Sequence, residues 1–454
     1  MNTETIKPGT NINKSAATLW ENPQIESALS HVAAAHPSWS ITPLQERAKL
    51  FIQLGKILRQ QQDQLATLIT QEMGKLFRES RAEVEKCALA CDYYAAHAEA
   101  FLANKNIASD ASNSYISYQP LGTLLAIMPW NFPLWQVMRF AIPALIGGNT
   151  AVLKHASNVP QCALAIEQLF IDADFPNHVF RSLMISSTQV SHVIEDPRIA
   201  AVTLTGSETA GRHVAANAGK QLKKTVLELG GSDAFILLED AKLEQAVNVA
   251  VTSRFLNAGQ SCIAAKRFIV VDSIADEFVA HFSAAAGELK YGDPMDAQTT
   301  LAPMARHDLR DELQQQVEQS IAQGALAVLG CHPVSDPGAF YPASILDQVK
   351  PGMPAYDDEL FGPVASIIRV RDEQQAIEVA NQSRFGLGGS VWTQDSQRGE
   401  NVARQMQCGA VFINGLVKSD PRLPFGGIKA SGYGRELSYL GLHEFQNAKT
   451  IWLR

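Results

Sequence analysis

Residues 200–211 have the sequence AAVTLTGSETAG, in which a short apolar run ends at a glycine and a helix-like segment follows. The run Ala200–Leu204 has the length and composition of a buried strand. Gly206 and Gly211 would let the backbone approach a dinucleotide pyrophosphate at the positive end of the helix. The usual G-x-G-x-x-G pattern is absent, so an ordinary strand-to-helix turn explains these residues equally well.

The same alternation of apolar runs and helical stretches continues on both sides of this segment. Strands are expected at Leu124–Met128, Thr150–Leu153, Ala200–Leu204, Thr225–Leu227 and Phe235–Leu238, and again at Phe268–Val271, Val364–Val370 and Ala410–Ile413. Buried strands that alternate with helices form parallel sheets with helices on both faces. The first hundred residues have apolar residues at helical spacing. We therefore predict an α/β protein with two doubly wound lobes and a crevice between them.

The chain, at 454 residues, is too long for one ordinary domain. We predict a cofactor-binding domain at 1–109 and 122–229, and a catalytic domain at 230–430. The segment Ala111–Gln119 alternates apolar and polar residues like an exposed strand, and the tail Gln446–Trp452 could pair with it. We predict that residues 110–121 and 431–454 form a small β extension that makes a homodimer or homotetramer, although a solvated hairpin fits almost as well.

The composition narrows the class of partner. Hydrophobic residues make up 46% of the chain, charged residues 19%, and the net charge is −8 without a cluster of Lys and Arg. These values disfavour nucleic acid and anionic membrane and favour a small-molecule partner. Met1–Lys14 has no apolar signal core, and prolines and Arg139 interrupt the apolar stretch Leu121–Leu153. Six scattered cysteines without metal-type spacing to histidine indicate no metal site and a reducing, cytoplasmic location.

Two short segments carry the reactive groups: ELGG at 228–231 and GQSC at 259–262. The Cys262 thiolate can attack a carbonyl carbon, and the Glu228 carboxylate can take a proton from water. Together they can form and hydrolyse a thioester, which is chemistry that converts an aldehyde to an acid. A lone cysteine is more often a buried apolar residue, so a catalytic role for Cys262 is favoured only together with Glu228 and the motifs described below.

Three further features are candidates for a site. PWNFP at 129–133 fixes the backbone around Asn131, whose amide can donate to a developing oxyanion. Lys154 ends an apolar strand and would reach a ribose hydroxyl or a phosphate, or else solvent. ELFGP at 359–363 offers the Glu359 carboxylate for ribose hydroxyls and the Phe361 ring for a nicotinamide.

In order and spacing, these segments, with FGGIKASGYGRE at 425–436, resemble the signature segments of the NAD(P)-dependent aldehyde dehydrogenase superfamily. The likeness covers essentially the whole chain. PWNFPLWQVMR at 129–139 and GLHEF at 441–445 are similar to short bacterial succinate semialdehyde dehydrogenases. The resemblance implies that Cys262 is the nucleophile, Glu228 the general base and Asn131 the oxyanion donor. It implies NAD or NADP as cofactor, with contacts from Trp130, Lys154, His155, Ala156, Ser157, Gly206, Ser207, Leu229, Glu359 and Phe361.

Two positions bear on specificity. Many NAD-preferring relatives have Glu where this chain has Ser157, which tolerates a 2′-phosphate and so permits NADP. Arg139 matches an Arg that holds the substrate carboxylate in succinate semialdehyde dehydrogenases, although a structural cation is the alternative. A second Arg of some relatives is Leu256 here; Gln136 or Lys418 and Ser419 could compensate.

We therefore expect oxidation of succinate semialdehyde to succinate with NAD(P)+, through a cysteine thiohemiacetal and a thioester. One alternative is a broad-specificity dehydrogenase of aliphatic and aromatic aldehydes. The other is a catalytically silent structural protein on the same fold. Glu228 disfavours transfer of the acyl group to CoA, because it can activate water.

Overall fold

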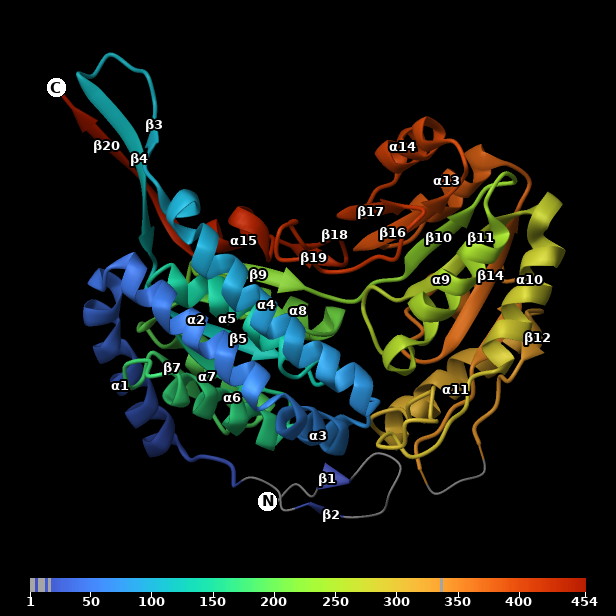
Figure 1. Ribbon diagram of the computed structural model, residues 1–454, viewed down its shortest axis with the longest axis horizontal. Helices are drawn as coiled ribbons and strands as arrows, with labels where there is room; N and C mark the ends of the chain where they lie inside the picture. The colour runs from blue at the N-terminus through green and yellow to red at the C-terminus, as the bar shows by residue number, and fades with distance from the viewer. Residues whose placement is uncertain (1–4, 7–12, 15–17, 335–337) are drawn as a thin grey trace.

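The computed structural model describes residues 5–6, 13–14, 18–334 and 338–454 (Figure 1). Of the polar segment Met1–Lys14, only the paired strands β1 (Thr5–Ile6) and β2 (Asn13–Lys14) belong to the described residues. No helix in the described ranges combines the length and apolar character that a membrane crossing needs.

The first hundred residues form helices, as predicted: α1 (Asn22–Ile41), α2 (Leu44–Gln60), α3 (Gln62–Met73) and α4 (Phe77–Leu102). Apolar residues at helical spacing, such as Phe51, Leu54 and Leu58 of α2, are fully buried. Helices α2 to α4 pack on one face of the first sheet, and α1 packs on the other face.

The first sheet has six strands in the order β19-β9-β8-β5-β6-β7, of which β19 is antiparallel and the other five are parallel. Alternate residues of β5 enter opposite cores, with Leu124 and Ala126 on one face and Leu125 on the other. The strands are β5 (Thr123–Met128), β6 (Thr150–His155), β7 (Phe180–Ser182), β8 (Ile199–Thr205), β9 (Lys224–Glu228) and β19 (Gly432–Tyr433). Their connections contain α5 (Trp135–Ile146), α6 (Pro160–Asp172), η1 (Ser187–Gln189), α7 (Val190–Glu195) and α8 (Glu208–Lys220).

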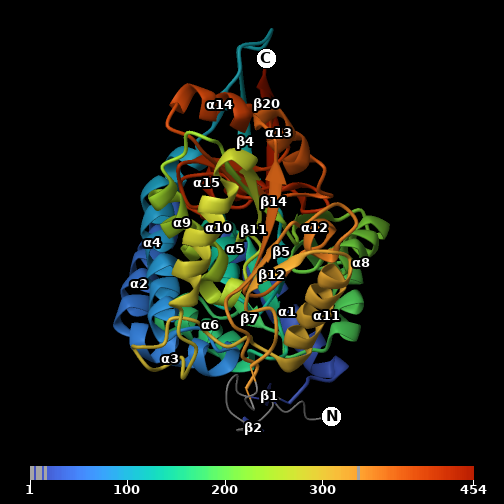
Figure 2. The same ribbon diagram turned by 90° about the vertical axis from the view of Figure 1, so that its right-hand side faces the viewer.

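The second sheet has seven strands in the order β12-β13-β14-β11-β10-β16-β17, with β12 antiparallel. One face is covered by α9 and α10 and the other by α11, α13 and α14, so this lobe also has helices on both faces (Figure 2). The strands are β10 (Asp233–Leu237), β11 (Ala265–Val271), β12 (Leu326–Leu329), β13 (Ser344–Asp347), β14 (Val364–Val370), β16 (Gly388–Trp392) and β17 (Ala410–Ile413). The helices are α9 (Leu243–Phe255), η2 (Leu256–Gly259), α10 (Asp272–Gly287), α11 (His307–Ala322), α12 (Pro354–Asp357), α13 (Glu373–Asn381) and α14 (Ser396–Gln405).

A separate three-stranded sheet extends from the body of the molecule (Figure 1). It contains β3 (Lys105–Asn106), β4 (Asn113–Pro120) and β20 (Gln446–Leu453), and β4 pairs antiparallel with β20 along its whole length. The predicted pairing of the tail with this strand is therefore confirmed. Strand β19 follows residue 431 but pairs with β9 in the first sheet, because the chain returns there before it reaches β20 through α15 (Ser438–His443). Two further short strands, β15 (Phe385–Gly386) and β18 (Ile428–Lys429), form a separate antiparallel pair.

Candidate active site

Cys262 lies between η2 and β11, three residues after a strained turn within η2. Asn257, Ala258 and Gly259 all have positive φ, at 54°, 51° and 70°. Only glycine adopts this conformation without cost, so two of the three residues store strain that the surroundings must offset. The side chain of Cys262 lines two cavities at once, one on each side of the turn.

Hydrogen bonds lock this turn to the predicted oxyanion donor. Asn131 Nδ2 donates to the carbonyl of Gln260 at 3.1 Å, and Asn257 Nδ2 donates to the carbonyl of Asn131 at 2.8 Å. The backbone N–H of Asn257 donates to Glu79 on α4 at 3.1 Å. A primary amide has two N–H donors, so within the described chain Asn131 keeps one for an oxyanion on a substrate attached to Cys262.

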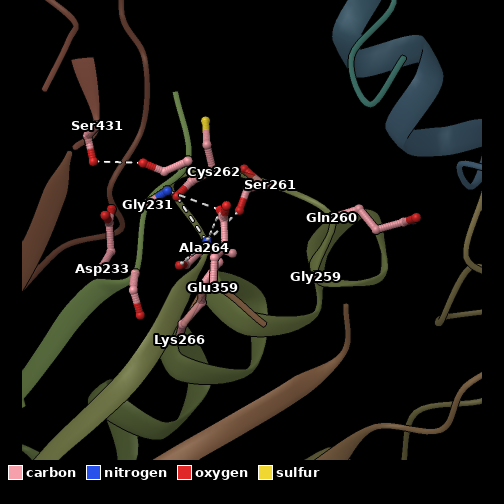
Figure 3. Close-up of polar contacts among 12 residues, drawn as sticks. Gly231, Asp233, Gly259, Gln260, Ser261, Cys262, Ala264, Lys266, Glu359 and Ser431 are labelled. Carbon is pink, nitrogen blue, oxygen red and sulfur yellow. Dashed lines mark hydrogen bonds and ion pairs between the residues drawn. The ribbon is translucent and has the colours of Figure 1, made fainter. Parts of the chain in front are cut away.

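The buried Lys266, which the sequence interpretation missed, holds the backbone at the nucleophile by hydrogen bonds. Lys266 Nζ donates to the carbonyls of Ser261 at 2.8 Å and Cys262 at 3.0 Å, and it lies 3.4 Å from Glu359 Oε1. The same carboxylate accepts from the N–H of Gly231 at 3.1 Å, and Figure 3 shows the Cys262 sulfur pointing away from this group. The available signal was a lysine inside the wholly buried strand β11.

Burial favours the neutral form of the Cys262 thiol. It raises the pKa of this thiol to about 12, although Arg139 and Lys266 partly oppose the effect. The nucleophilic form is the thiolate, so attack on a carbonyl requires a proton acceptor or a change of environment.

Glu228 ends β9 and is buried. Burial raises the pKa of its carboxyl well above the ordinary value, and the nearby Glu436 carboxylate adds to the rise. A side chain at Gly426 would meet Glu228 Oε1 at 2.6 Å, which places the carboxyl against that glycine. Among the described residues, those that line the two cavities at Cys262 do not include Glu228.

The larger of these two cavities, of about 290 Å³, combines groups from both lobes. It brings together eight of the predicted cofactor and catalytic residues with Gln136: Trp130, Asn131, Gly206, Ser207, Leu229, Cys262, Glu359 and Phe361. The Trp130 and Phe361 rings meet edge to face, 6.0 Å between centroids. The sequence interpretation missed the α11 side of this cavity, because that helix has no distinctive motif: Leu309, Glu312, Leu313 and Gln316.

The donor set of this cavity fits a dinucleotide. Strands β8, β5 and β6 are neighbours, and β5 is the point where the strand order reverses, which is where open α/β sheets bind ligands. Gly206 follows β8, and Ser207 caps α8 by accepting a hydrogen bond from the N–H of Ala210 at 3.3 Å. The positive end of α8 suits a phosphate, and the aromatic and aliphatic walls suit a flat ring.

Four other predicted cofactor residues lie at the end of β6 and just after it, and they are not among the residues that line this cavity. Lys154 is half-buried, and burial lowers its pKa; Ala156 is half-buried and Ser157 is exposed. His155 is buried: its Nε2 donates to the carbonyl of Pro133 at 2.9 Å, and its Nδ1 accepts from Ala156 N–H at 2.9 Å. Its imidazole is thus held within the protein, so a cofactor contact at His155 would use the backbone.

The smaller cavity, of about 110 Å³, lies on the other side of Cys262 and contains all three predicted substrate residues: Gln136, Arg139 and Ser419. Arg139, however, forms a buried ion pair with Glu436, and its guanidinium lies 4.5 Å from the centroid of the Phe425 ring. Arg139 thus lines the small cavity, as predicted, but Glu436 already compensates its charge. Its role as a ligand of the substrate carboxylate stays a prediction. The alternative, a structural cation, is supported by the ion pair with Glu436.

The comparisons with known proteins agree along the whole chain. The sequence profile described as Aldehyde dehydrogenase family matches residues 1–451. A Synechocystis sp. protein named probable succinate-semialdehyde dehydrogenase (NADP(+)) is 49% identical over 449 residues, which are 99% of each chain. Succinate semialdehyde dehydrogenase (NAD(P)+) Sad of Escherichia coli is 50% identical over 94% of this chain and 93% of its own.

A solved structure extends the agreement to three dimensions. Succinic semialdehyde dehydrogenase from Streptococcus pyogenes, in complex with NADP+, matches with a TM-score of 0.97 and 41% identity, covering 99% of both chains. Fold, site geometry and sequence therefore lead to one conclusion: this chain belongs to the aldehyde dehydrogenase family.

Proposed function

We propose that this protein oxidises succinate semialdehyde to succinate with NAD(P)+ as hydride acceptor. The observation that carries the proposal is that Cys262 lines both the cavity with the aromatic rings and the α8 cap and a smaller cavity that contains cationic side chains. Relatives about half identical over nearly the full chain bear the name of this activity. We also infer a cytoplasmic homo-oligomer, in line with six free cysteines and the projecting β4–β20 pair.

Cys262 and Asn131 act before the thioester forms, and Glu228 acts afterwards. The Cys262 thiolate attacks the aldehyde carbon, and the free N–H of Asn131 meets the oxyanion that exists only after attack. As the carbonyl re-forms, the C–H bond of the former aldehyde breaks and a thioester remains on Cys262; NAD(P)+, when bound, would accept the hydride. Glu228 then takes a proton from water, which attacks the acyl carbon and releases the acid. For that step the Glu228 carboxyl has to ionise and turn from Gly426 toward the cavity.

A substrate panel tests the proposal. We expect kcat/KM for succinate semialdehyde to exceed that for butanal, a neutral aldehyde of equal length, by at least about tenfold with either cofactor. Equal values would favour the broad-specificity alternative, for which the compensated charge of Arg139 is the supporting observation.

Cofactor choice is testable at Ser157. Ser157→Glu places a carboxylate near the expected 2′-phosphate, so we expect KM for NADP+ to rise on the order of 10- to 100-fold while KM for NAD+ changes little. Initial rates at saturating aldehyde give both constants, and Ser157→Ala is the matched control without the charge. An equal rise for both cofactors would remove Ser157 from the ribose pocket.

Arg139→Met tests whether this cation is structural. Because the change leaves Glu436 buried without its partner, we expect the free energy of unfolding to fall by about 3 kcal/mol. We expect kcat/KM for succinate semialdehyde and butanal to fall by similar factors, since the charge of Arg139 is already paired with Glu436. A selective loss of at least about tenfold with succinate semialdehyde would instead make Arg139 the carboxylate ligand.

A further inference from the structure

Lys86 on α4 occupies a position for which the reaction described above has no use. Its side chain lines the small cavity at Cys262 and also an outer cavity of about 600 Å³ between α4 and α9. Lys86 Nζ donates to Ser419 Oγ at 2.6 Å and lies 4.3 Å from the centroid of the Trp135 ring. The ammonium group is therefore held at the junction of the two cavities.

The other cations around these cavities are engaged or exposed. Arg139 pairs with Glu436, and Lys75 pairs with Glu83 inside the protein. Arg78 and Lys418 are exposed to solvent. Among the described residues that line the two cavities, Lys86 is the half-buried cation without a carboxylate at ion-pair distance.

Ser419 completes a set of donors that matches a carboxylate. Its hydroxyl oxygen accepts from Lys86 Nζ and from Trp135 Nε1, the latter at 3.1 Å. With both lone pairs used, its own O–H remains to donate, and Lys86 keeps two further N–H donors. A carboxylate would bind well to the half-buried Lys86 ammonium and the buried Ser419 hydroxyl, because it brings both a negative charge and acceptor oxygens.

We propose that Lys86, positioned by Ser419 and Trp135, binds the distal carboxylate of the aldehyde substrate and determines the preference for a semialdehyde. This inference rests on the proposed function and deepens it. It gives the small cavity a charge that Arg139, compensated by Glu436, does not offer. It also supplies a cation to the cavity that Leu256 lines, at the position where some relatives have a second arginine.

The surroundings of Lys86 make the interaction dependent on pH. Burial lowers the pKa of Lys86 to about 8, and the Arg139 charge adds to the lowering. Cys87 and Glu83 on its own helix and Asp420 beyond Ser419 raise it. The ammonium form, which attracts a carboxylate, is present below this pKa and is lost as pH rises through it.

Two variants and one control test the proposal with the full-length protein. We expect Lys86→Met to lower kcat/KM for succinate semialdehyde by at least about tenfold, mainly through KM, and to leave butanal nearly unchanged. Lys86→Arg should restore most of the loss. Lys56→Met, which removes an exposed lysine of α2, should behave like wild type with both aldehydes.

The pH profile supplies an independent readout. In wild type, the ratio of kcat/KM for succinate semialdehyde to that for butanal should fall as pH rises through about 8. With Lys86→Arg the ratio should stay level over the same range, because arginine keeps its charge. A purely structural lysine would change the two aldehydes in parallel and leave the ratio flat.

The possible failures are distinguishable. A wild-type preference that survives Lys86→Met would overturn the role of Lys86 and leave the proposed function intact. A parallel loss with both aldehydes would also overturn it, in favour of a structural role. Wild type without any preference for succinate semialdehyde over butanal would overturn the proposed function and this inference together.

Discussion

Replacing Cys262 by alanine is expected to lower aldehyde oxidation by at least about 10⁴-fold while NAD(P)+ still binds. The thiol makes the covalent bond to substrate, whereas the cofactor cavity is built mainly from Trp130, Leu229, Phe361 and the start of α8. Absorbance of NAD(P)H measures turnover, and quenching of tryptophan fluorescence measures cofactor affinity.

Cys408→Ala is the matched control. Cys408 is also half-buried, and burial likewise raises its pKa to about 12, but it lies beside β17, away from both cavities at Cys262. The control should keep wild-type turnover. Measurable oxidation by Cys262→Ala above a trace would mean that another group attacks the aldehyde.

The strand pattern was predictable from sequence because buried strands differ from helices in length and composition. Leu124–Met128 and Ala200–Leu204 were expected as buried strands of a parallel sheet, and β5 and β8 are parallel strands, although the sequence did not predict that they are neighbours. The alternation of Ala111–Gln119 predicted an exposed strand, and the tail Gln446–Trp452 was expected as its possible partner. The division of the chain into domains stays a prediction, and β19 shows how a two-residue strand escapes any pattern.

The sequence motifs predicted several residues that the structure brings together in one cavity, including Trp130, Leu229 and Phe361, and their cofactor contacts stay predictions. Which buried charges form ion pairs with one another was not predictable from the sequence. The pairing of Arg139 with Glu436 joins positions almost 300 residues apart, and only the folded chain brings them into contact. Lys86 lies in a helix without a distinctive motif, and the lysine of the buried strand β11, Lys266, has no motif that indicates its partners. Their roles follow from what surrounds them, which a single sequence does not show.

Glu228→Gln should separate the two halves of the reaction. Acylation of Cys262 and hydride transfer do not need the carboxylate, so we expect one burst of NAD(P)H per active site. The thioester should then hydrolyse slowly, and steady-state kcat should fall about 10²- to 10⁴-fold. Stopped-flow absorbance gives the burst, and mass spectrometry of the quenched protein should find the acyl group on Cys262. Glu244→Gln, an exposed carboxylate of α9, is the control.

Glu228→Gln also tests how kcat depends on pH. Burial and Glu436 hold the pKa of the Glu228 carboxyl well above its ordinary value, so its base form appears only as pH rises. Wild-type kcat should therefore increase with pH when deacylation limits turnover, and Glu228→Gln should lose that increase. The burst rate should still rise with pH in both proteins, because burial also raises the pKa of Cys262. A variant without any burst would show that Glu228 acts before the thioester forms, as the base that ionises the thiol.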